Sequence, residues 1–435
     1  MKLYDVIVFG AGTAGIIAAL QAAREGAQTL LVEKDGLPGG TMTNARTACP
    51  GLFHAWGRQI IGGIGWELVT RCVRENGDTL QDFSHPIREQ HWREQISINP
   101  ALYALIADEA LMQSGCEVMY DTMCAAIDDG DPKFNDPKII TLCTKTGLKE
   151  VAAMVIIDCT GDANMVTLAG LPTEKDAVRQ PATYNCRIDG YDLSAIDMEK
   201  LRTAYETAVA RGELRFTDIS RSTDSFLPLW LQKHGDNANH ILSEVDRPES
   251  SEDRTAILQQ GRLALLKLYR FFRAQPGFEG LRFTDLAPQA GIRETVRIRG
   301  KQKILIENFI RGKVYPDAVC YSFYPVDLHT LSGQGLENQY FEEGKVGTVP
   351  RGALLPEGSR NWLAAGRCIC CDRAVSSVVR IQATCMATGQ AAGALAALAA
   401  KTGKDVEKIP MPMLRETLKR HGAILPESPA GRTAP

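Results

Sequence analysis

The first 33 residues constrain the fold of this chain more than any other stretch. Asp5 and an apolar run at residues 6–9 lead into a G-x-G-x-x-G turn at residues 10–15, and an alanine-rich run follows. Strand, glycine turn and helix in this order form the opening unit of a dinucleotide-binding fold. Gly10 permits the tight turn, Gly12 leaves room for a pyrophosphate, and Gly15 lets helix and strand pack closely. The helix N-terminus then faces the phosphates with unpaired N–H groups.

A second apolar run, residues 27–32, ends at Glu33, eighteen residues after Gly15. An acid at about this distance binds ribose hydroxyls in such folds, so we predict that role for Glu33. A glycine-rich loop, residues 34–41, follows directly and would pass close to the far end of the bound cofactor. This arrangement resembles FAD-dependent oxidoreductases of the glutathione-reductase and fumarate-reductase type. The resemblance implies FAD as the cofactor.

Composition excludes some classes of partner. The 49 basic and 52 acidic residues give a net charge of −3, which provides no global field for a nucleic acid, although a local basic patch at residues 293–303 stays open. No separate apolar signal region precedes the first strand, and no run of about 18 uninterrupted apolar residues occurs. We therefore expect a cytoplasmic protein with a small-molecule substrate and no membrane partner. The twelve cysteines are scattered, as reduced core residues are.

Further segments repeat the FAD-type signals. The apolar run 151–157 delivers Asp158-Cys-Thr-Gly-Asp162, which resembles the "ATG" segment of FAD flavoproteins. Residues 361–366 form a strand ending in glycine, and residues 380–400 form a small-residue helix whose N-terminus would point at the flavin. A strand at residues 117–127 would supply a backbone contact to adenine at Cys124 and Ala125. Residues 128–137 are predicted as a surface turn, with a metal loop as the alternative.

These signals predict an α/β fold with a second domain inserted in the first. The first part is a Rossmann-like FAD-binding domain with a parallel sheet and helices on both sides, over residues 1–170 and 350–405. A mixed α+β substrate or cap domain occupies residues 171–349, and a C-terminal helix and tail occupy 406–435. Helices are expected at residues 60–74, 100–114 and 254–273, the last with Leu263, Leu266, Tyr269 and Phe271 toward the interior.

The whole chain from residue 3 to about 403 resembles the bacterial FAD-dependent oxidoreductase family related to fumarate-reductase flavoproteins. The motifs that carry the resemblance are Gly39-Gly-Thr41, residues 291–300, 324–329 and 349–356, and Ala365-Gly-Arg-Cys368. The resemblance implies cofactor contacts at a set of residues along the chain. These are Gly10, Gly12, Thr13, Ala14, Gly15, Glu33, Lys34, Gly39, Gly40, Thr41, Cys124, Ala125, Thr160, Gly161, Asp162, Gly366, Arg367, Gln382 and Ala383.

Three residues are candidates for catalysis. Asp327 and His329 share one face of a predicted strand, because side chains two apart point the same way. An Asp beside a His can fix its tautomer and raise its pKa, so we predict that His329 moves the proton that accompanies hydride transfer. Arg293 comes right after Gly291-Ile292 and would reach inward to hold a substrate oxygen or carboxylate. The alternative to a catalytic role for the Asp–His pair is a hydrogen-bonded pair on the surface. Arg297 and Arg299, on the strand after Arg293, are predicted to lie on a solvent-exposed strand face.

Other reactive residues also have a structural explanation beside the functional one. Cys368, Cys370 and Cys371 invite a metal or dithiol interpretation, but zinc sites usually need a second pair of ligands, so buried packing is favoured and no metal site is predicted. Cys49 and His54 lie in the loop after the flavin glycines, where shaping of that loop is favoured over contact with substrate or covalent attachment to the flavin.

The predicted function is an FAD-dependent oxidoreductase that passes hydride between flavin N5 and a small polar metabolite, by hydroxyl oxidation or reduction of an activated double bond. The alternative is a flavoprotein subunit that relays electrons to a partner. An RNA-modifying flavoprotein would need a basic surface that the charge balance does not indicate. A second G-x-G-x-x-G after a strand is absent from the sequence, which argues against a nicotinamide domain. The sequence leaves the substrate and the oligomeric state open.

Overall fold

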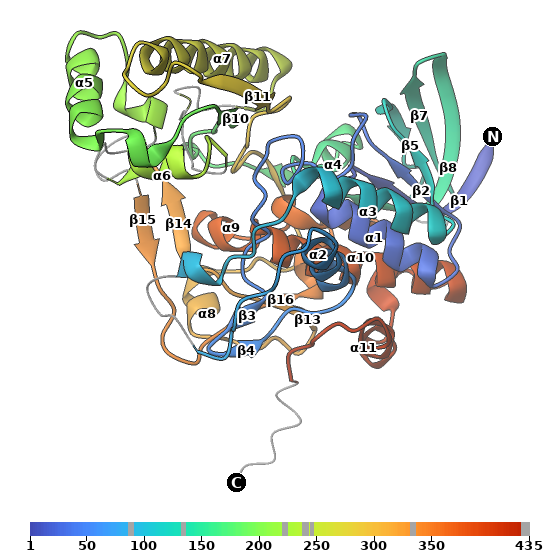
Figure 1. The fold of residues 1–435 in the computed structure, drawn as a ribbon. Helices are drawn as coiled ribbons and strands as arrows, with labels where there is room; N and C mark the ends of the chain where they lie inside the picture. Colours follow the sequence, from blue (N-terminus) through green and yellow to red (C-terminus); the bar gives the residue numbers. More distant parts are fainter. Residues whose placement is uncertain are drawn as a thin grey trace.

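The computed structural model describes residues 1–85, 91–131, 136–219, 225–236, 243, 248–330 and 336–427. Its largest sheet has seven strands in the order β5-β2-β1-β8-β7-β6, with β17 paired to β8 (Figure 1). Pairing is parallel from β5 to β8 and at β17, and antiparallel at β7 and β6. The predicted α/β fold class is confirmed. The strands are β1 (Lys2–Phe9), β2 (Thr29–Val32), β5 (Glu117–Met119), β6 (Met123–Asp128), β7 (Lys138–Thr144), β8 (Gly147–Asp158) and β17 (Trp362–Ala364).

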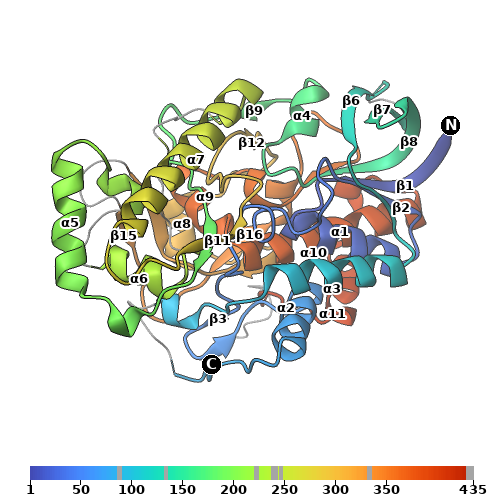
Figure 2. The same ribbon diagram turned by 45° about the horizontal axis from the view of Figure 1, so that its top comes forward.

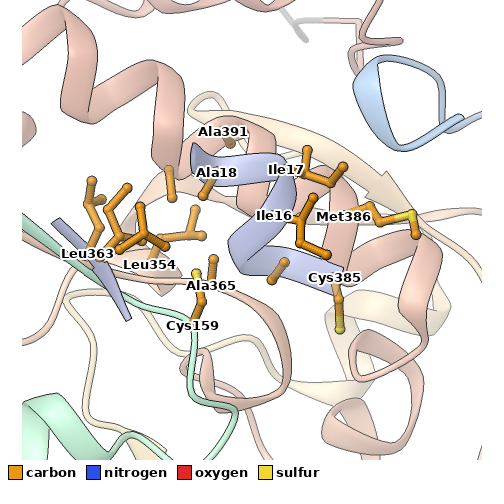
Figure 3. Packing of buried hydrophobic residues seen from close by; sticks show 14 of the residues in the cluster. Ile16, Ile17, Ala18, Cys159, Leu354, Leu363, Ala365, Cys385, Met386 and Ala391 are labelled. Atoms are coloured by element: carbon orange, nitrogen blue, oxygen red, sulfur yellow. The ribbon is translucent and has the colours of Figure 1, made fainter. Parts of the chain in front are cut away.

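Two helices rich in small residues pack against each other beside this sheet. They are α1 (Thr13–Arg24) and α10 (Gln382–Thr402). A Cβ on Gly389 would overlap the carbonyl oxygen of Ala14, and one on Gly393 would overlap that of Ala18. The two backbones can approach this closely because both positions are glycine. Figure 3 shows the apolar side chains of the same contact, including Ile16 and Ile17 from α1.

Helix α10 is long and apolar enough to cross a membrane by length and composition, which a count of uninterrupted apolar residues does not indicate. In the structure, 89% of its most apolar 18-residue window is buried inside the protein. Its apolar surface is therefore already covered by other parts of the chain, as in a core helix.

Among the remaining helices of the main core, those near residues 60–74 and 100–114 and the C-terminal helix are predicted by the sequence, and three shorter ones are not. Asn99 caps α3 as expected, since its side chain accepts the N–H groups of Ala101 and Leu102. The helix predicted at residue 60 begins only at Ile64, because Gly63 has φ of 81° and cannot continue a right-handed helix. The helices are α2 (Ile64–Glu75), α3 (Pro100–Gln113), α4 (Asn164–Leu168), α8 (Ile306–Ile310), α9 (Arg373–Val379) and α11 (Met411–Arg420).

A second hydrophobic core is built from residues 184–281. Three helices surround it with one two-stranded ladder, and we call this part, residues 184–286, the cap. Both ribbon views place it at the end of the molecule away from β1 (Figures 1 and 2). Buried residues of 298–355 belong to the main core instead. The exact domain limits stay a prediction. The cap elements are α5 (Met198–Ala210), α6 (Phe226–Gln232), α7 (Ser251–Arg273), β10 (Cys186–Asp189) and β11 (Arg282–Leu286).

Two sequence predictions, one about helix α7 of the cap and one about a strand of the large sheet, are wrong. Leu263 and Leu266 of α7 are 60% and 39% exposed, whereas Leu265 and Leu268 are buried. The buried face of α7 is therefore shifted by one residue from these two predicted positions. The reason is that the buried face is set by the side chains of the cap that α7 contacts. Tyr269 and Phe271, also predicted to face the interior, are half-buried and do pack against the hydrophobic core of the cap.

The predicted strand 117–127 is also two strands. The chain breaks at Asp121, whose φ is 49°, and β6 then pairs with β7 rather than continuing beside β2. Cys124 and Ala125 lie on β6, half-buried and exposed respectively. The turn predicted at 128–137 includes residues 132–135, and the tail includes 428–435, all of which lie outside the described residues.

Short ladders complete the part of the chain that carries the site. A two-stranded pairing of β14 with β15 joins residues from 326 to 339, and another pairs β13 with β16. All the short strands outside the large sheet and the cap are listed here with their bounds: β3 (His54–Ala55), β4 (Arg58–Gln59), β9 (Thr173–Glu174), β12 (Arg297–Ile298), β13 (Ala318–Ser322), β14 (Val326–His329), β15 (Leu336–Gln339) and β16 (Gly347–Pro350).

Candidate functional site

The glycines of the N-terminal turn differ in their surroundings. A Cβ at Gly10 would lie 2.7 Å from the carbonyl oxygen of Cys159, and one at Gly15 would overlap that of Gly10. A Cβ at Gly12, in contrast, would meet no described atom within 4 Å. The space in front of Gly12 is therefore open, and it lies at the N-terminus of α1. This is where a pyrophosphate binds in a dinucleotide fold, so the turn fits the group.

The glycine-rich loop after β2 crosses this turn. Gly39 forms an isolated parallel bridge with Gly12, and its N–H donates to the carbonyl oxygen of Ala11 at 2.7 Å. A Cβ on Gly40 would lie 2.9 Å from the Cα of Gly12. Gly40 also has φ of 54°, so both its conformation and its space favour glycine. The loop and the turn therefore lie directly against each other, and a role of the loop in binding the cofactor stays a prediction.

Glu33 lies at the end of β2 with its carboxylate turned toward the turn. Its Oε2 accepts the N–H of Ala11 at 2.6 Å, and its Oε1 accepts the N–H of Asp35 at 2.9 Å. The residue is buried, and burial raises the pKa of its carboxyl. Lys34 and Thr41, also predicted to contact the cofactor, are exposed, and Lys34 pairs with Asp35 at 2.7 Å.

Asp158, at the end of β8, organises the segment that follows it. Its Oδ1 accepts the N–H and the hydroxyl of Thr160 at 3.0 and 2.7 Å. Its Oδ2 accepts the N–H groups of Met165 and Val166 at 2.9 and 3.1 Å. These bonds satisfy a fully buried carboxylate and fix the turn at residues 160–163 beside the glycine turn.

Asp162 and Arg367, both predicted cofactor residues, form an ion pair. Arg367 also donates to the carbonyl oxygens of Gly161, at 2.9 Å, and Ile292. Arg254 of α7 lies 2.6 Å from the same Asp162 carboxylate. Burial would raise the pKa of Asp162, but the two guanidinium groups outweigh it and lower that pKa. Asp162 and Arg367 thus connect the predicted cofactor segments to helix α7 of the cap and to Ile292.

The start of α10 lies beside the same site. Gly366, with φ of 84°, is so close to α1 that a Cβ there would lie 3.1 Å from the Cβ of Ala14. Gln382 donates to the carbonyl oxygen of Thr47 at 2.7 Å, and Ala383 donates its N–H to Pro50 at 2.7 Å. The first turn of α10 therefore holds the loop that follows the flavin glycines.

Asp327 and His329 are brought together as the strand pattern predicts. Asp327 Oδ2 lies 3.2 Å from His329 Nε2, and both side chains are largely buried, with 14% and 3% of their surface exposed. The alternative of a surface pair is therefore wrong. Arg380, which the sequence analysis did not single out, donates to the backbone oxygen of Asp327 at 3.1 Å and lies 3.4 Å from its Oδ2.

The expected rise in the His329 pKa is wrong. Burial lowers the pKa of His329 to about 3, and the charge of Arg293 adds to this, so that the neighbouring Asp327 carboxylate cannot restore it. For Asp327, burial would raise the pKa, but the hydrogen bond from His329 and the charges of Arg380 and Arg293 outweigh burial and lower it. The pair at neutral pH is therefore a neutral imidazole beside a carboxylate.

A buried amide and carboxylate link this pair to the residues around it. Gln180 Oε1 accepts the backbone N–H of His329 at 3.0 Å, and Gln180 Nε2 donates to Glu294 at 3.0 Å. Arg373 lies 3.3 Å from Glu294. Arg293, next to Glu294, donates to the carbonyl oxygen of Pro181 at 2.5 Å and is 6% exposed. Gln180 and Arg373 give no local sequence signal, since each is remote from the residues that it contacts.

Residues 292–295 join the two groups. Ile292 accepts from Arg367, and the hydroxyl of Thr295 donates to Asp162 at 2.8 Å. Arg293, between them, lies close enough to Asp327 and His329 to lower the pKa of both. The structure therefore places the predicted catalytic residues next to the segment that the predicted cofactor residues hold.

Some candidates lie elsewhere. His54 stacks on Phe83 at 3.9 Å between ring centroids and packs against Trp66, and burial lowers its pKa to about 4. Arg297 is buried, and it pairs with Asp176 at 2.7 Å, so the predicted solvated face is wrong for this residue. Arg299 is exposed, as predicted.

The cysteine run has no exposed thiol. Cys368, Cys370 and Cys371 are buried, and burial raises the pKa of each. Cys49 is half-buried, with its Sγ 3.6 Å from the hydroxyl of Ser97. Within the described residues, no three His, Cys, Asp or Glu side chains are grouped to hold a metal ion.

The fold, the open glycine turn and the buried acid at the end of β2 define a dinucleotide-binding protein. A family model described as "FAD dependent oxidoreductase" matches residues 5–418. The chain therefore belongs to this family, it is an FAD-dependent oxidoreductase, and FAD is its cofactor. The predicted relation to fumarate-reductase and glutathione-reductase flavoproteins is finer than this match and stays a prediction.

Some known proteins resemble a short part of this chain, and others align with most of it. A thioredoxin reductase of Listeria monocytogenes serovar 1/2a is 54% identical over 43 residues, which span 10% of this chain and 13% of the relative. A geranylgeranyl bacteriochlorophyll reductase-like protein of Thermoplasma acidophilum is 13% identical, with a TM-score of 0.41 over 97% of this chain and 83% of the other. A flavoprotein/dehydrogenase of Cytophaga hutchinsonii is 15% identical, with a TM-score of 0.40 over 95% and 83%.

Proposed function

We propose that this oxidoreductase passes a hydride between FAD and a small polar metabolite. It would oxidise a hydroxyl group or reduce an activated double bond. The observation that carries the proposal is the position of Arg293, on the segment that joins Asp162 and Arg367 to the buried Asp327–His329 pair. When bound, FAD would supply the two-electron chemistry at flavin N5. The protein must then supply a group that moves the matching proton and a group that holds the substrate.

His329 fits the first role. The Asp327 carboxylate can only accept a hydrogen bond, so the proton lies on Nε2 of His329 and Nδ1 is the basic nitrogen. A neutral imidazole can take a proton from a substrate hydroxyl. Because burial keeps His329 neutral at physiological pH, the ring is in the form that can accept a proton, as oxidation of a hydroxyl would require. Asp327 would act by orienting the ring.

Arg293 and Arg380 fit the second role. Arg380 lies 3.4 Å from the Asp327 carboxylate, and the charge of Arg293 lowers the pKa of both Asp327 and His329. The Nε–H of Arg380 is buried without an acceptor in the described part of the chain. Leaving such a donor unsatisfied costs about 1–3 kcal/mol, which a substrate oxygen bound there would offset. An arginine can also hold an oxyanion at two points, so a hydroxy acid or another oxygen-rich metabolite suits the site.

The test uses the purified FAD-loaded protein without oxygen. It is mixed with a panel of hydroxy acids, polyols and enoates, and the visible absorbance of the flavin is followed, starting from the oxidised and from the dithionite-reduced protein. We expect bleaching by a hydroxyl compound. Arg380→Lys should raise the concentration that is needed, while Arg299→Lys, an exposed control, should not.

Two results would contradict the proposal. The first is reaction with artificial electron carriers but with no compound of the panel, which would favour an electron-relay subunit. The second is a substrate whose turnover is the same in wild type, Arg293→Lys and Arg380→Lys.

A further inference from the structure

A wide groove opens in the cap, away from the residues described above. It lies between α5 and α7 and has a volume of about 850 Å³. Both ribbon views show these two helices at the end of the molecule opposite β1 (Figures 1 and 2). The volume falls in the range of about 300–1,000 Å³ that is usual for small-molecule sites.

The floor of the groove is apolar. Ala208 and Leu214 are 4% exposed, and Phe271 and Ala204 are half-buried beside them. The ring of Phe271 is held edge-on by Tyr205, with 5.4 Å between the centroids. Small alanines on α5 leave the space, and the Phe271 ring offers a rigid apolar surface for a flat ligand body to pack against.

The rim carries an excess of positive charge. Arg211, Lys267 and Arg270 line the groove, and none of them forms an ion pair with a described residue. Glu213 is the rim carboxylate without an ion-pair partner among the described residues, since Glu199 pairs with Arg202. Within the described part of the chain, three cations without an ion-pair partner therefore line the groove together with one such anion. A charge excess beside a partly desolvated apolar surface attracts anions more strongly than the same charges in open water would.

We propose that this groove binds an organic anion with an apolar body, such as an aryl or acyl carboxylate or a phosphate ester. The apolar part would lie on Leu214 and Phe271. The anionic group would lie between Arg211 of the α5 end and Lys267 and Arg270 of α7. This site is separate from the proposed flavin chemistry, and it does not depend on the function proposed above.

The probe is 1-naphthyl phosphate, titrated calorimetrically into the FAD-loaded protein. The two halves of the probe, 1-naphthol and inorganic phosphate, are titrated separately. We expect one site per chain and at least about ten-fold weaker binding of each half, because the groove contacts both parts. The double substitution Lys267→Gln and Arg270→Gln should weaken binding of the whole probe at least about ten-fold. Arg74→Gln, an exposed helical arginine of the main core, is the matched control.

Ala204→Leu gives a second measurement that leaves the charges intact. It narrows the groove, so binding should weaken by a similar factor while the FAD content and the unfolding temperature stay at the wild-type values. The proposal is overturned if the probe does not bind at millimolar concentration, or if either half binds as tightly as the whole. It is also overturned if the affinity survives both the double substitution and Ala204→Leu.

Discussion

The guanidinium of Arg46 lies 2.7 Å from the carboxylate of Asp236, with a second contact of 3.1 Å between Arg46 Nε and the other carboxylate oxygen. Arg46 belongs to the segment that follows the flavin glycines, and Asp236 belongs to the cap. Arg46 also contacts Asp285 of β11, and the neighbouring carbonyl of Ala45 accepts from Asn185 at 2.8 Å. The buried side chain of Arg46 therefore connects the segment next to the predicted cofactor site to the cap.

Removing this arginine should destabilise the protein strongly. Arg46 is 9% and Asp236 16% exposed, so Arg46→Ala leaves a largely buried carboxylate with only the more distant Arg187 near it. Breaking such a pair costs about 3–5 kcal/mol, which urea unfolding of the FAD-loaded protein would measure. Arg187→Ala is the control, because Arg187 lies 3.8 Å from the same Asp236 but is 53% exposed. Equal losses in the two variants would show that burial of the Arg46 pair is unimportant.

Gly12→Ala should separate cofactor binding from folding. The added Cβ meets no described protein atom within 4 Å, and the backbone of Gly12 has φ of −72°, which any residue adopts. The variant should fold normally but lose FAD, because the methyl group occupies the pyrophosphate position. Gly389→Ala is the contrasting case, since its Cβ would overlap the backbone of α1, and it should lower the unfolding temperature. The test compares the flavin absorbance of each purified variant with its thermal unfolding temperature. A yellow Gly12→Ala protein would refute the assignment of the pyrophosphate site to Gly12.

Glu33→Ala should weaken FAD binding without unfolding the protein. A carboxylate that accepts ribose hydroxyls makes charge-assisted hydrogen bonds worth about 1.5–3 kcal/mol, or about one to two decades in affinity. Titration of FAD into the apoprotein in a calorimeter measures the change. Glu117→Ala, at an exposed position on the neighbouring β5, should bind FAD like the wild type. An unchanged affinity in Glu33→Ala would mean that another residue holds the ribose.

His329→Gln should slow flavin reduction by an identified substrate while leaving FAD binding intact. General acid–base catalysis contributes about 10²–10⁴-fold, so a loss of that size is expected in stopped-flow traces. Asp327→Asn should lose less, because it misorients the imidazole without removing it. His421→Gln, on the C-terminal side of α11, is the histidine control. Wild-type turnover in His329→Gln would assign the proton to another group.

The buried histidine should also leave a signature in the pH dependence of stability. His329 stays neutral in the folded protein down to about pH 3, whereas a histidine of the unfolded chain takes up a proton near pH 6.5. Between these values the unfolded state binds one more proton, so the free energy of unfolding should fall as the pH is lowered, by up to about 1.4 kcal/mol per unit from this residue.

Urea unfolding at several pH values between about 5 and 7 measures this slope. In His329→Gln the slope should be shallower than in the wild type. Asp327 adds nothing in this window, because its own pKa is lowered from a value that already lies below it. Identical slopes in the two proteins would show that His329 has the same pKa in the folded and the unfolded state.

The sequence by itself determined the opening of the fold and much of the cofactor site. The strand from Lys2 to Phe9, the glycine turn, α1 and Glu33 are read from neighbours in the chain, because strand and helix periodicity and the spacing of glycines are local properties. The same holds for the Asp327–His329 pair, since two residues apart on a strand point to one side. Membership of the FAD family confirms the cofactor that these motifs imply.

Only the tertiary structure decided which polar groups are buried and what they meet. Arg380 reaches Asp327 from 53 residues away, and Gln180 reaches His329 from 149. The fall in the pKa of His329 and the burial of Arg297 arise from such contacts, and so does the stripe of α7 that packs on the cap. Desolvation depends on every segment that folds around a side chain, so no window of sequence contains it.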